Sequence, residues 1–285
     1  RLEKLDWMGP ATKAEALKKL DGYTIKVGYP DNPRDYSLVV IRDDDLVGNV
    51  LRAAAADWGF YCQRVKGPVD RSDWWMTPQT NDAYNGSLRD IVFPAGILLP
   101  PMFDPNADAA YNFGAAGGVI GHELTHGFDD QGSQYDEKGN LNNWWTDEDK
   151  KKFLEKTKRI VTQFSNYKVL DSLHINGDAT QGENIADLGG VVMGYEAFKK
   201  TAQGQGNDSI GGFTPDQRYF LGYGYAWMVN RRPESLARQV MSDVHSPSQY
   251  RVNGPVSNIP EFYKAFDVKP GDAMYREDSV RVVIW

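Results

Sequence analysis

Two of the four histidines in this sequence, His122 and His126, flank Glu123 in an H-E-x-x-H motif. Apolar residues recur around the motif at helical spacing, which predicts a helix over about residues 115–128 and places both imidazoles on one face. On that face the two rings can bind a single Zn²⁺, at nitrogen distances of about 2.0–2.1 Å. Glu123 lies one position around the helix, within reach of a metal-bound water, and is the natural general base.

A second motif supplies two more carboxylates at the same spacing. Glu183 and Asp187 lie four residues apart in a segment that predicts a helix from residue 183 to about residue 201. A catalytic zinc site needs a third protein ligand and an open position, and Glu183 is the candidate ligand. Asp187 could hold the other ring nitrogen of a ligand histidine. Gly189 and Gly190 are poor helix formers, and they favour a close approach of two helices.

Each motif also has a simpler interpretation. The first can be a polar helix face with two unrelated histidines. The second can be an ordinary amphipathic helix whose acids face water. The joint occurrence of the two motifs favours the zinc site.

Turn, cap and periodicity signals predict the elements that would position these residues. Helices are expected at 12–20, 43–64, after Thr146, after Thr214-Pro215, and from Pro233 to about Asp243. Strands are expected at 80–84 and 89–93, joined by a tight turn at Asn85-Gly86, and at 280–285, with loop structure from Ser246 onward. The apolar side of the 43–64 helix is expected to dock on another element, with Cys62 buried.

The composition is that of a folded globular protein, with 41% hydrophobic residues among 285. A net charge of −7 argues against a nucleic-acid partner and against an anionic membrane surface. The apolar stretch at 91–103 is interrupted by prolines and is shorter than the ~20 residues of a membrane-spanning helix. A single cysteine excludes an internal disulfide.

The sequence resembles the catalytic half of the neprilysin family of zinc endopeptidases, which includes endothelin-converting enzymes and bacterial oligopeptidase O. The resemblance extends over essentially the whole chain and is carried by residues 77–80, 91–103, 122–130, 183–190 and 245–255. It implies an α+β, thermolysin-like catalytic domain, mainly helical with a small sheet, at residues 71–285. Residues 1–70 would form a helical segment that links to the missing N-terminal half, which contains most of the large helical lid.

The resemblance also implies a role for each residue of the two motifs. His122, His126 and Glu183 would bind one Zn²⁺ per chain, and Glu123 would activate a zinc-bound water. Asp187 matches the aspartate that supports the metal ligands from outside.

Three further residues are matched to catalysis by the resemblance. His245 would stabilise the oxyanion of the transition state, Asp243 would orient it, and Arg251 would bind a substrate carbonyl on the leaving side of the scissile bond. The physics agrees, because attack on a peptide carbonyl builds negative charge that a histidine can stabilise. His174 has no such match and is interpreted as structural or solvent-facing.

Substrate-binding positions are implied in the same way. Ile97, Val119 and Trp227 resemble the lining of a specificity pocket for a hydrophobic residue just after the cut, with Met102 where the family usually has Phe; all four could also be core residues. Asp82, followed by Ala83, stands where the family has an Asn that clamps the substrate chain. Since a carboxylate cannot donate a hydrogen bond, we expect weaker binding of substrates with a free carboxylate nearby.

The sequence therefore predicts a zinc-dependent endopeptidase that cuts short peptides on the N-terminal side of hydrophobic residues. The alternative is a fragment that binds zinc and peptide but turns over little without its N-terminal half. Oligopeptides are the expected substrates, and the N-terminal half of the same precursor is the expected partner. An extracytoplasmic location is favoured over a cytoplasmic one.

Overall fold

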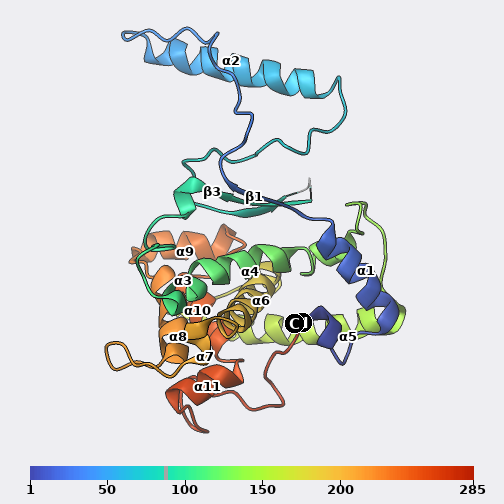
Figure 1. Cartoon of the computed structure of the whole chain (residues 1–285), viewed down its shortest axis with the longest axis vertical. Coiled ribbons are helices and arrows are strands. Elements are labelled where there is room, and N and C mark those ends of the chain that lie inside the picture. Colours follow the sequence, from blue (N-terminus) through green and yellow to red (C-terminus); the bar gives the residue numbers. More distant parts are fainter. Residues whose placement is uncertain (87–88) are drawn as a thin grey trace.

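The structure, a computed structural model, describes residues 1–86 and 89–285. Helices predominate, and the strands form one three-stranded sheet and one two-stranded ribbon (Figure 1). The α-helices are α1 Pro10–Asp21, α2 Leu46–Arg64, α3 Ala109–Gly114, α4 Ala116–His126, α5 Asp147–Ser165, α6 Gln181–Phe198, α7 Ala202–Gln205, α8 Pro215–Ala226, α9 Pro233–Ser242, α10 Ser248–Val256 and α11 Pro260–Phe266. The strands are β1 Thr24–Gly28, β2 Tyr84–Gly86, β3 Asp90–Pro94, β4 Lys168–Leu170 and β5 Leu173–His174, and short 3-10 turns lie at Leu2–Lys4, Ala95–Ile97 and Gly132–Gln134.

The two helices that carry the motifs, α4 and α6, pack closely against each other in the middle of the molecule (Figure 1). A Cβ on Gly190 would lie 2.4 Å from the backbone oxygen of Gly118, and a Cβ on Gly189 would lie 2.2 Å from the Thr125 hydroxyl. Side chains at these positions would push the helices apart. The close approach predicted from Gly189 and Gly190 is confirmed.

The first 28 residues belong to the same packed unit as the C-terminus. Leu5, Trp7 and Met8 are buried in the main core, where Trp7 also lies against the terminal Trp285 ring. The Trp7 indole donates a hydrogen bond of 2.9 Å to the backbone oxygen of Ile284. Residues 1–28, which the sequence groups with the linking segment, therefore pack on the body of the molecule. We call residues 1–28 and 74–285 the body.

A small sheet lies over α4, with strand order β1-β3-β2 (Figure 1). β1 pairs in parallel with β3, and β2 pairs antiparallel to β3. The turn predicted at Asn85-Gly86 is wrong, because both residues lie within β2, opposite Ile91 and Asp90. The Asn85 side chain is held there by a hydrogen bond to α4. Residues 87–88, between β2 and Arg89, lie outside the described residues.

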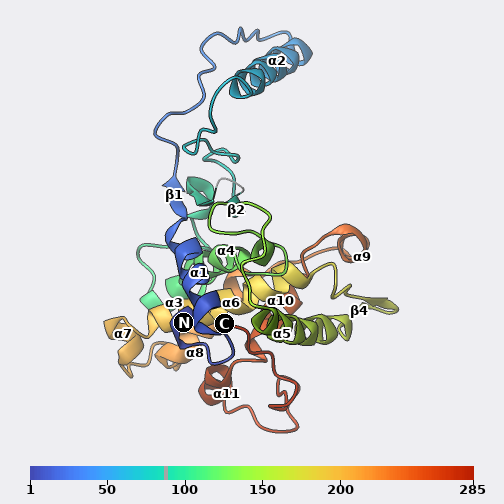
Figure 2. The same cartoon turned by 90° about the vertical axis from the view of Figure 1, so that its right-hand side faces the viewer.

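Residues 29–73, which we call the arm, stand away from the body and carry α2 at the far end (Figure 2). The predicted helix is confirmed, with Asp45 accepting the Gly48 amide hydrogen as its N-cap. The predicted docking of its apolar side is not seen, since α2 has no buried residue. The predicted burial of Cys62 is also wrong, because Cys62 is exposed on this helix. Among the described residues, no helix has the length and apolar character needed to span a membrane.

The predicted helix starts are confirmed where capping residues mark them. Thr146 caps α5, and Thr214 forms a reciprocal capping box with Gln217 at α8. The loop predicted from Ser246 is wrong, because α10 and α11 form there despite Pro255, stabilised by packing on α6 and α8. The predicted strand at 280–285 is also wrong. Val282, Ile284 and Trp285 are buried, whereas Val280 and Val283 are exposed, and none of them pairs with a strand among the described residues. The Val282 amide instead donates to the Asn258 side chain.

Candidate metal centre and substrate cleft

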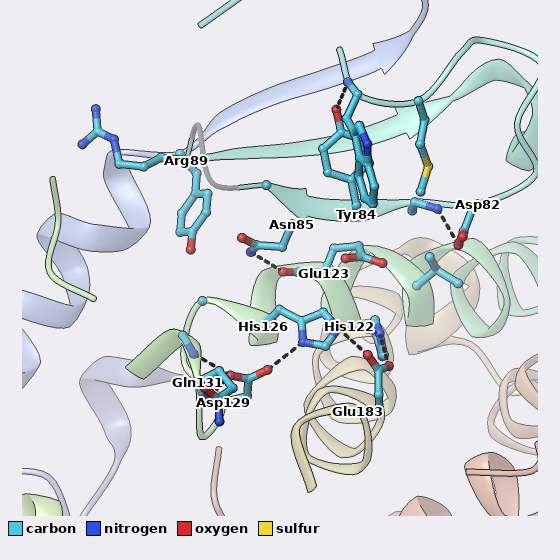
Figure 3. A pocket seen from close by; sticks show the side chains of 18 of the residues that line it. Asp82, Tyr84, Asn85, Arg89, His122, Glu123, His126, Asp129, Gln131 and Glu183 are labelled. Carbon is cyan, nitrogen blue, oxygen red and sulfur yellow. Dashed lines mark hydrogen bonds and ion pairs between the residues drawn. The ribbon is translucent and has the colours of Figure 1, made fainter. Parts of the chain in front are cut away.

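Three side chains from the two motif helices converge on one point (Figure 3). The Nε2 atoms of His122 and His126 lie 2.9 Å apart. The Glu183 carboxylate approaches both, with Oε2 at 3.3 Å from His122 Nε2 and Oε1 at 3.6 Å from His126 Nε2. The i, i+4 spacing on α4 accounts for the two rings. The close α4–α6 packing brings the Glu183 carboxylate from the first turn of α6, although Glu183 lies 57 residues after His126 in the chain.

These distances fit a divalent metal ion. Ligands at about 2.0–2.1 Å from a tetrahedral zinc lie about 3.3–3.4 Å from one another, close to the three separations observed. The donor set, two imidazole nitrogens and one carboxylate, is one that zinc accepts in catalytic sites. His122, His126 and Glu123 also offer ligand atoms within 4.8 Å of one another. The residues present therefore fit zinc.

The opposite nitrogen of each ring is held by a carboxylate. His122 Nδ1 lies 2.8 Å from Asp187 Oδ1, and His126 Nδ1 lies 2.7 Å from Asp129 Oδ2. Such partners fix the ring orientation and direct the Nε2 atoms at the shared point. The Asp187 contact agrees with the predicted supporting role. Asp129 was not predicted, although its position three residues after His126 was a signal available in the sequence.

The carboxylates of the centre stabilise positive charge at the point where the three side chains meet. Burial opposes protonation of His122, but the hydrogen bonds with Asp187 and Glu183 outweigh it and raise the pKa of His122 to about 10. Burial alone would raise the pKa of Glu183, but the two histidines hold it well below its ordinary value. Glu183 is therefore an anion at neutral pH, as a carboxylate that binds a metal must be.

Glu123 lies beside this point on the same helix, with a side chain that is only 5% exposed. Burial raises the pKa of Glu123, despite the opposing effect of the two histidines. A carboxylate with a raised pKa is a stronger proton acceptor near neutral pH. The Asn85 side chain donates a 2.6 Å hydrogen bond to the Glu123 backbone oxygen and so joins β2 to this part of α4. The sequence pattern places Asn85 only in a predicted turn, and no local signal indicates this contact.

His245 and Asp243 lie between α9 and α10, on the other side of Glu183. His245 Nε2 is 3.3 Å from Glu183 Oε1, and its Nδ1 is 2.7 Å from Asp243 Oδ1. The predicted His245–Asp243 pairing is therefore present. His174, in contrast, is exposed and lies in β5, with Nδ1 3.2 Å from the Ser165 backbone oxygen, in agreement with its interpretation as structural or solvent-facing.

Arg251, on α10, is tied to the metal centre through Asp187. Its Nε and one terminal nitrogen each lie 2.8 Å from an Asp187 oxygen, and the guanidinium lies 4.0 Å from the centre of the Trp227 ring. Burial opposes the charge, but Asp187 and Glu183 keep the pKa of Arg251 above its ordinary value. Asp187 thus supports a histidine and an arginine at once.

A cavity of about 830 Å³ is lined by His122, Glu123, His126, Glu183, His245 and Arg251. Its lining also includes every predicted substrate-binding residue: Asp82, Ala83, Ile97, Met102, Val119, Trp227 and Arg251. Ile97 is buried with Ala83 in a small second core, against which Met102 and Val119 pack, so these side chains serve packing as well as lining the cavity. Asp82 is exposed and accepts the Ala83 amide hydrogen at 2.9 Å.

Lys19 holds the loop that follows the H-E-x-x-H helix. Its ammonium, from α1, donates to the backbone oxygens of Gly132 and Tyr135 at 2.6 and 2.8 Å. Asp129 accepts the amide hydrogen of Gly132 in the same loop. The sequence carries no local signal for this contact, because Lys19 and Gly132 lie on elements far apart in the chain.

The chain was compared with known protein families. The model of the family described as "Peptidase family M13" matches residues 81–282. Endothelin-converting enzyme-like 1 of Homo sapiens is 39% identical over 277 residues, covering 93% of this chain and 36% of that protein. The neutral endopeptidase of Lactobacillus helveticus is 37% identical over 288 residues, covering 100% of this chain and 43% of that protein.

Solved structures show the same relation. The zinc metalloprotease Zmp1 of Mycobacterium tuberculosis, in complex with an inhibitor, superposes with a TM-score of 0.95 at 45% identity, covering 100% of this chain and 44% of that one. PepO from Lactobacillus rhamnosis gives a TM-score of 0.90 at 36% identity, with 100% and 44% covered. The chain thus spans less than half the length of these relatives.

Proposed function

The chain belongs to peptidase family M13, and from this we propose that it is the catalytic part of a zinc-dependent endopeptidase that hydrolyses short peptides. The observation that carries the proposal is the convergence of His122 Nε2, His126 Nε2 and Glu183 at separations of 2.9–3.6 Å. These three residues would hold the zinc. When bound, zinc polarises the scissile carbonyl and lowers the pKa of water.

Glu123 would move the protons of the reaction. Its carboxylate accepts a proton as a water oxygen attacks the carbonyl carbon, and later gives that proton to the amine nitrogen as the C–N bond breaks. The raised pKa of Glu123 supports both transfers, because a group that titrates closer to neutral pH can accept and then release a proton.

His245 and Arg251 would act on the substrate from positions next to Glu183. The His245 ring, oriented by Asp243, would stabilise the negative charge that develops on the carbonyl oxygen. Arg251 would bind a substrate carbonyl on the leaving side with the guanidinium hydrogens not directed at Asp187. The placement of both residues on the cavity wall supports these roles.

The proposed preference for a hydrophobic residue after the cut rests on four apolar residues of the cavity lining. Ile97, Met102, Val119 and Trp227 line the cavity, and an apolar side chain would be removed from water against them. Met102 is flexible, so the pocket would accept several apolar side-chain shapes.

The test is peptide hydrolysis together with zinc content. We expect the purified protein to hold zinc, to cleave an internally quenched peptide with a hydrophobic residue after the cut, and to stop when a chelator is added. Glu123→Gln should retain zinc and lose about 10²–10⁴-fold in kcat, because only the proton acceptor is removed. A zinc-loaded wild type that binds peptide without cleaving it would favour a binding fragment instead.

The proposed partner is the remainder of a longer protein, docked on the arm. The chain covers 36–43% of these relatives' lengths, and α2 on the arm has apolar residues but no buried residue. We call this surface the apolar face of α2; it comprises Leu46, Val47, Val50, Leu51 and Trp58, each 59–76% exposed. An exposed apolar patch of this kind marks an interaction surface. We propose residues 29–73 as the segment that links the body, the catalytic domain, to that remainder.

Hydrogen exchange tests the proposed docking. The amides of residues 46–64 should exchange rapidly in this chain and be protected in the longer protein. Equal exchange rates in the two would contradict it. The proposed extracytoplasmic location rests on the family resemblance and would be checked by fractionation of cells that express the longer protein.

A further inference from the structure

The loop that carries His245 changes from exposed to buried within a few residues. α9, which precedes it, has no buried residue, and Asp243 and Val244 are exposed. Ser246, directly after His245, is only 1% exposed. The position of the catalytic ring therefore depends on how the chain is attached at Ser246.

Ser246 is attached to α6 by a buried hydrogen bond. Its hydroxyl donates to Asn184 Oδ1 at 2.7 Å, and Asn184 is fully buried. The Asn184 amide in turn donates to the Thr180 hydroxyl at 2.8 Å, which donates to the Asn176 backbone oxygen at 3.0 Å. Asn184 directly follows Glu183 on α6, so one turn of helix positions both the metal-binding carboxylate and the support of the His245 loop.

The His245 ring itself contacts α6 through Glu183, with Nε2 3.3 Å from Oε1. The remaining contacts of His245 lie within its own exposed segment. Asp243, which binds His245 Nδ1 and its backbone amide, lies on the same exposed segment. Gln239, which donates to the His245 backbone oxygen at 3.3 Å, lies on exposed α9. These bonds orient the ring relative to its own loop. The Ser246–Asn184 bond joins that loop to the helix that carries Glu183.

We propose that Ser246 and Asn184 are positioning residues that act through His245, a role that rests on the proposed peptidase function. Without the hydroxyl, Asn184 Oδ1 loses its partner in a dry environment, and the His245 loop loses its bond to α6. A displacement of about 1 Å in a catalytic group can cost about 100-fold in rate. We expect Ser246→Ala to lower kcat about 10–100-fold, with KM changed by less than about threefold.

The test is a double-mutant cycle with a matched control. Ser257 is also buried, at 4% exposure, and its hydroxyl donates to the Gly254 backbone oxygen at 2.8 Å, away from His245. Ser257→Ala should therefore leave kcat within twofold. In the His245→Ala background, Ser246→Ala should cause no further fall in kcat. An equal fall in both backgrounds, or equal effects of the two serine variants, would overturn the proposal.

A second measurement does not require activity. Hydrogen exchange of the amides at 244–246 should be at least tenfold faster in Ser246→Ala than in Ser257→Ala, at a temperature where circular dichroism shows both variants folded. Unchanged exchange there would overturn the positioning role. If the two variants show this difference in exchange but the wild type hydrolyses no peptide, the positioning role would stand and the proposed peptidase function would be contradicted.

Discussion

The α4–α6 pair in the body and α2 in the arm are all helices with apolar residues, yet their surroundings are opposite. On α6, Ile185, Leu188 and Val191 are at most 4% exposed. On α2, Leu46 and Trp58 are 76% and 70% exposed. Burying such a side chain contributes roughly 1.5–3 kcal/mol to the free energy of folding. The buried residues of α6 therefore stabilise the body, whereas the exposed residues of α2 make no such contribution.

The proposed catalytic function belongs to the body, and the proposed association with a partner belongs to the arm. All groups of the metal centre lie in the body, supported by buried contacts such as Asp187 with Arg251. The arm contributes no residue to the lining of the cleft among the residues described. Changes in the body should therefore alter metal binding and stability, whereas changes in the arm should leave both nearly intact.

The largest effect is expected at Asp187. Asp187→Asn should lower zinc affinity about 10–100-fold and destabilise the fold by about 3–5 kcal/mol, because it removes the charge that pairs with buried Arg251 and supports His122. Competition with a zinc-binding dye and urea unfolding would measure the two effects. Asp216→Asn is the control, since its pair with Lys199 is partly exposed and worth about 0–1 kcal/mol. Similar losses in both variants would refute the special role of Asp187.

A pair of glycine substitutions compares body and arm directly. Gly190→Ala should destabilise the protein by about 1–3 kcal/mol, because the new Cβ would lie 2.4 Å from the Gly118 oxygen. Gly59→Ala on α2 should instead be neutral or stabilising by up to about 1 kcal/mol, because nothing lies within 4 Å of the new Cβ and alanine favours helix. Thermal unfolding would measure both. Equal destabilisation would break the distinction between the two regions.

A pH-dependent effect is expected where α5 meets the N-terminus. Burial favours the protonated form of Asp149, but hydrogen bonds from Thr12 and Gly9 outweigh it and hold the pKa of Asp149 below its ordinary value. The lowered pKa means that this stabilisation is present above the unfolded value of about 3.9 and is lost as pH falls through the folded pKa.

Asp149→Asn should therefore cost about 1–3 kcal/mol in urea unfolding at pH 7, with the difference from wild type shrinking below about pH 4. Asp147→Asn, an exposed position in the same helical turn, should cost about 1 kcal/mol or less. A cost for Asp149→Asn that stays constant down to pH 3 would show that the carboxylate charge is not responsible.

The smallest effect is expected at the cleft rim. Asp82→Asn should lower KM about fivefold for a peptide with a free carboxylate just after the hydrophobic residue, because about 1 kcal/mol of charge repulsion is removed. KM for the amidated peptide should change little, and the pH profile of the free peptide should shift. Unchanged selectivity and an unchanged pH profile would reject this role for Asp82.

Much of the candidate site was predictable from sequence because its spacing is local. Residues four apart on a helix share a face whatever the rest of the chain does, so His122 with His126, and Glu183 with Asp187, could be paired in advance. The glycines at 189–190 indicated close helix packing because they have no side chain to hold the helices apart. Assignment of His245 and Arg251 depended on the family resemblance, since neither lies in a spacing pattern of its own.

Tertiary structure alone decided the contacts between distant segments. The bonds of Asn85 to α4, Lys19 to the loop after α4, and Ser246 to Asn184 join elements that no local pattern connects. The same holds for β1 pairing with β3, and for α10 and α11 forming where loop signals predominate. Local backbone geometry determines which residues share a helix face, whereas burial and hydrogen bonding depend on which segments meet once the chain is folded.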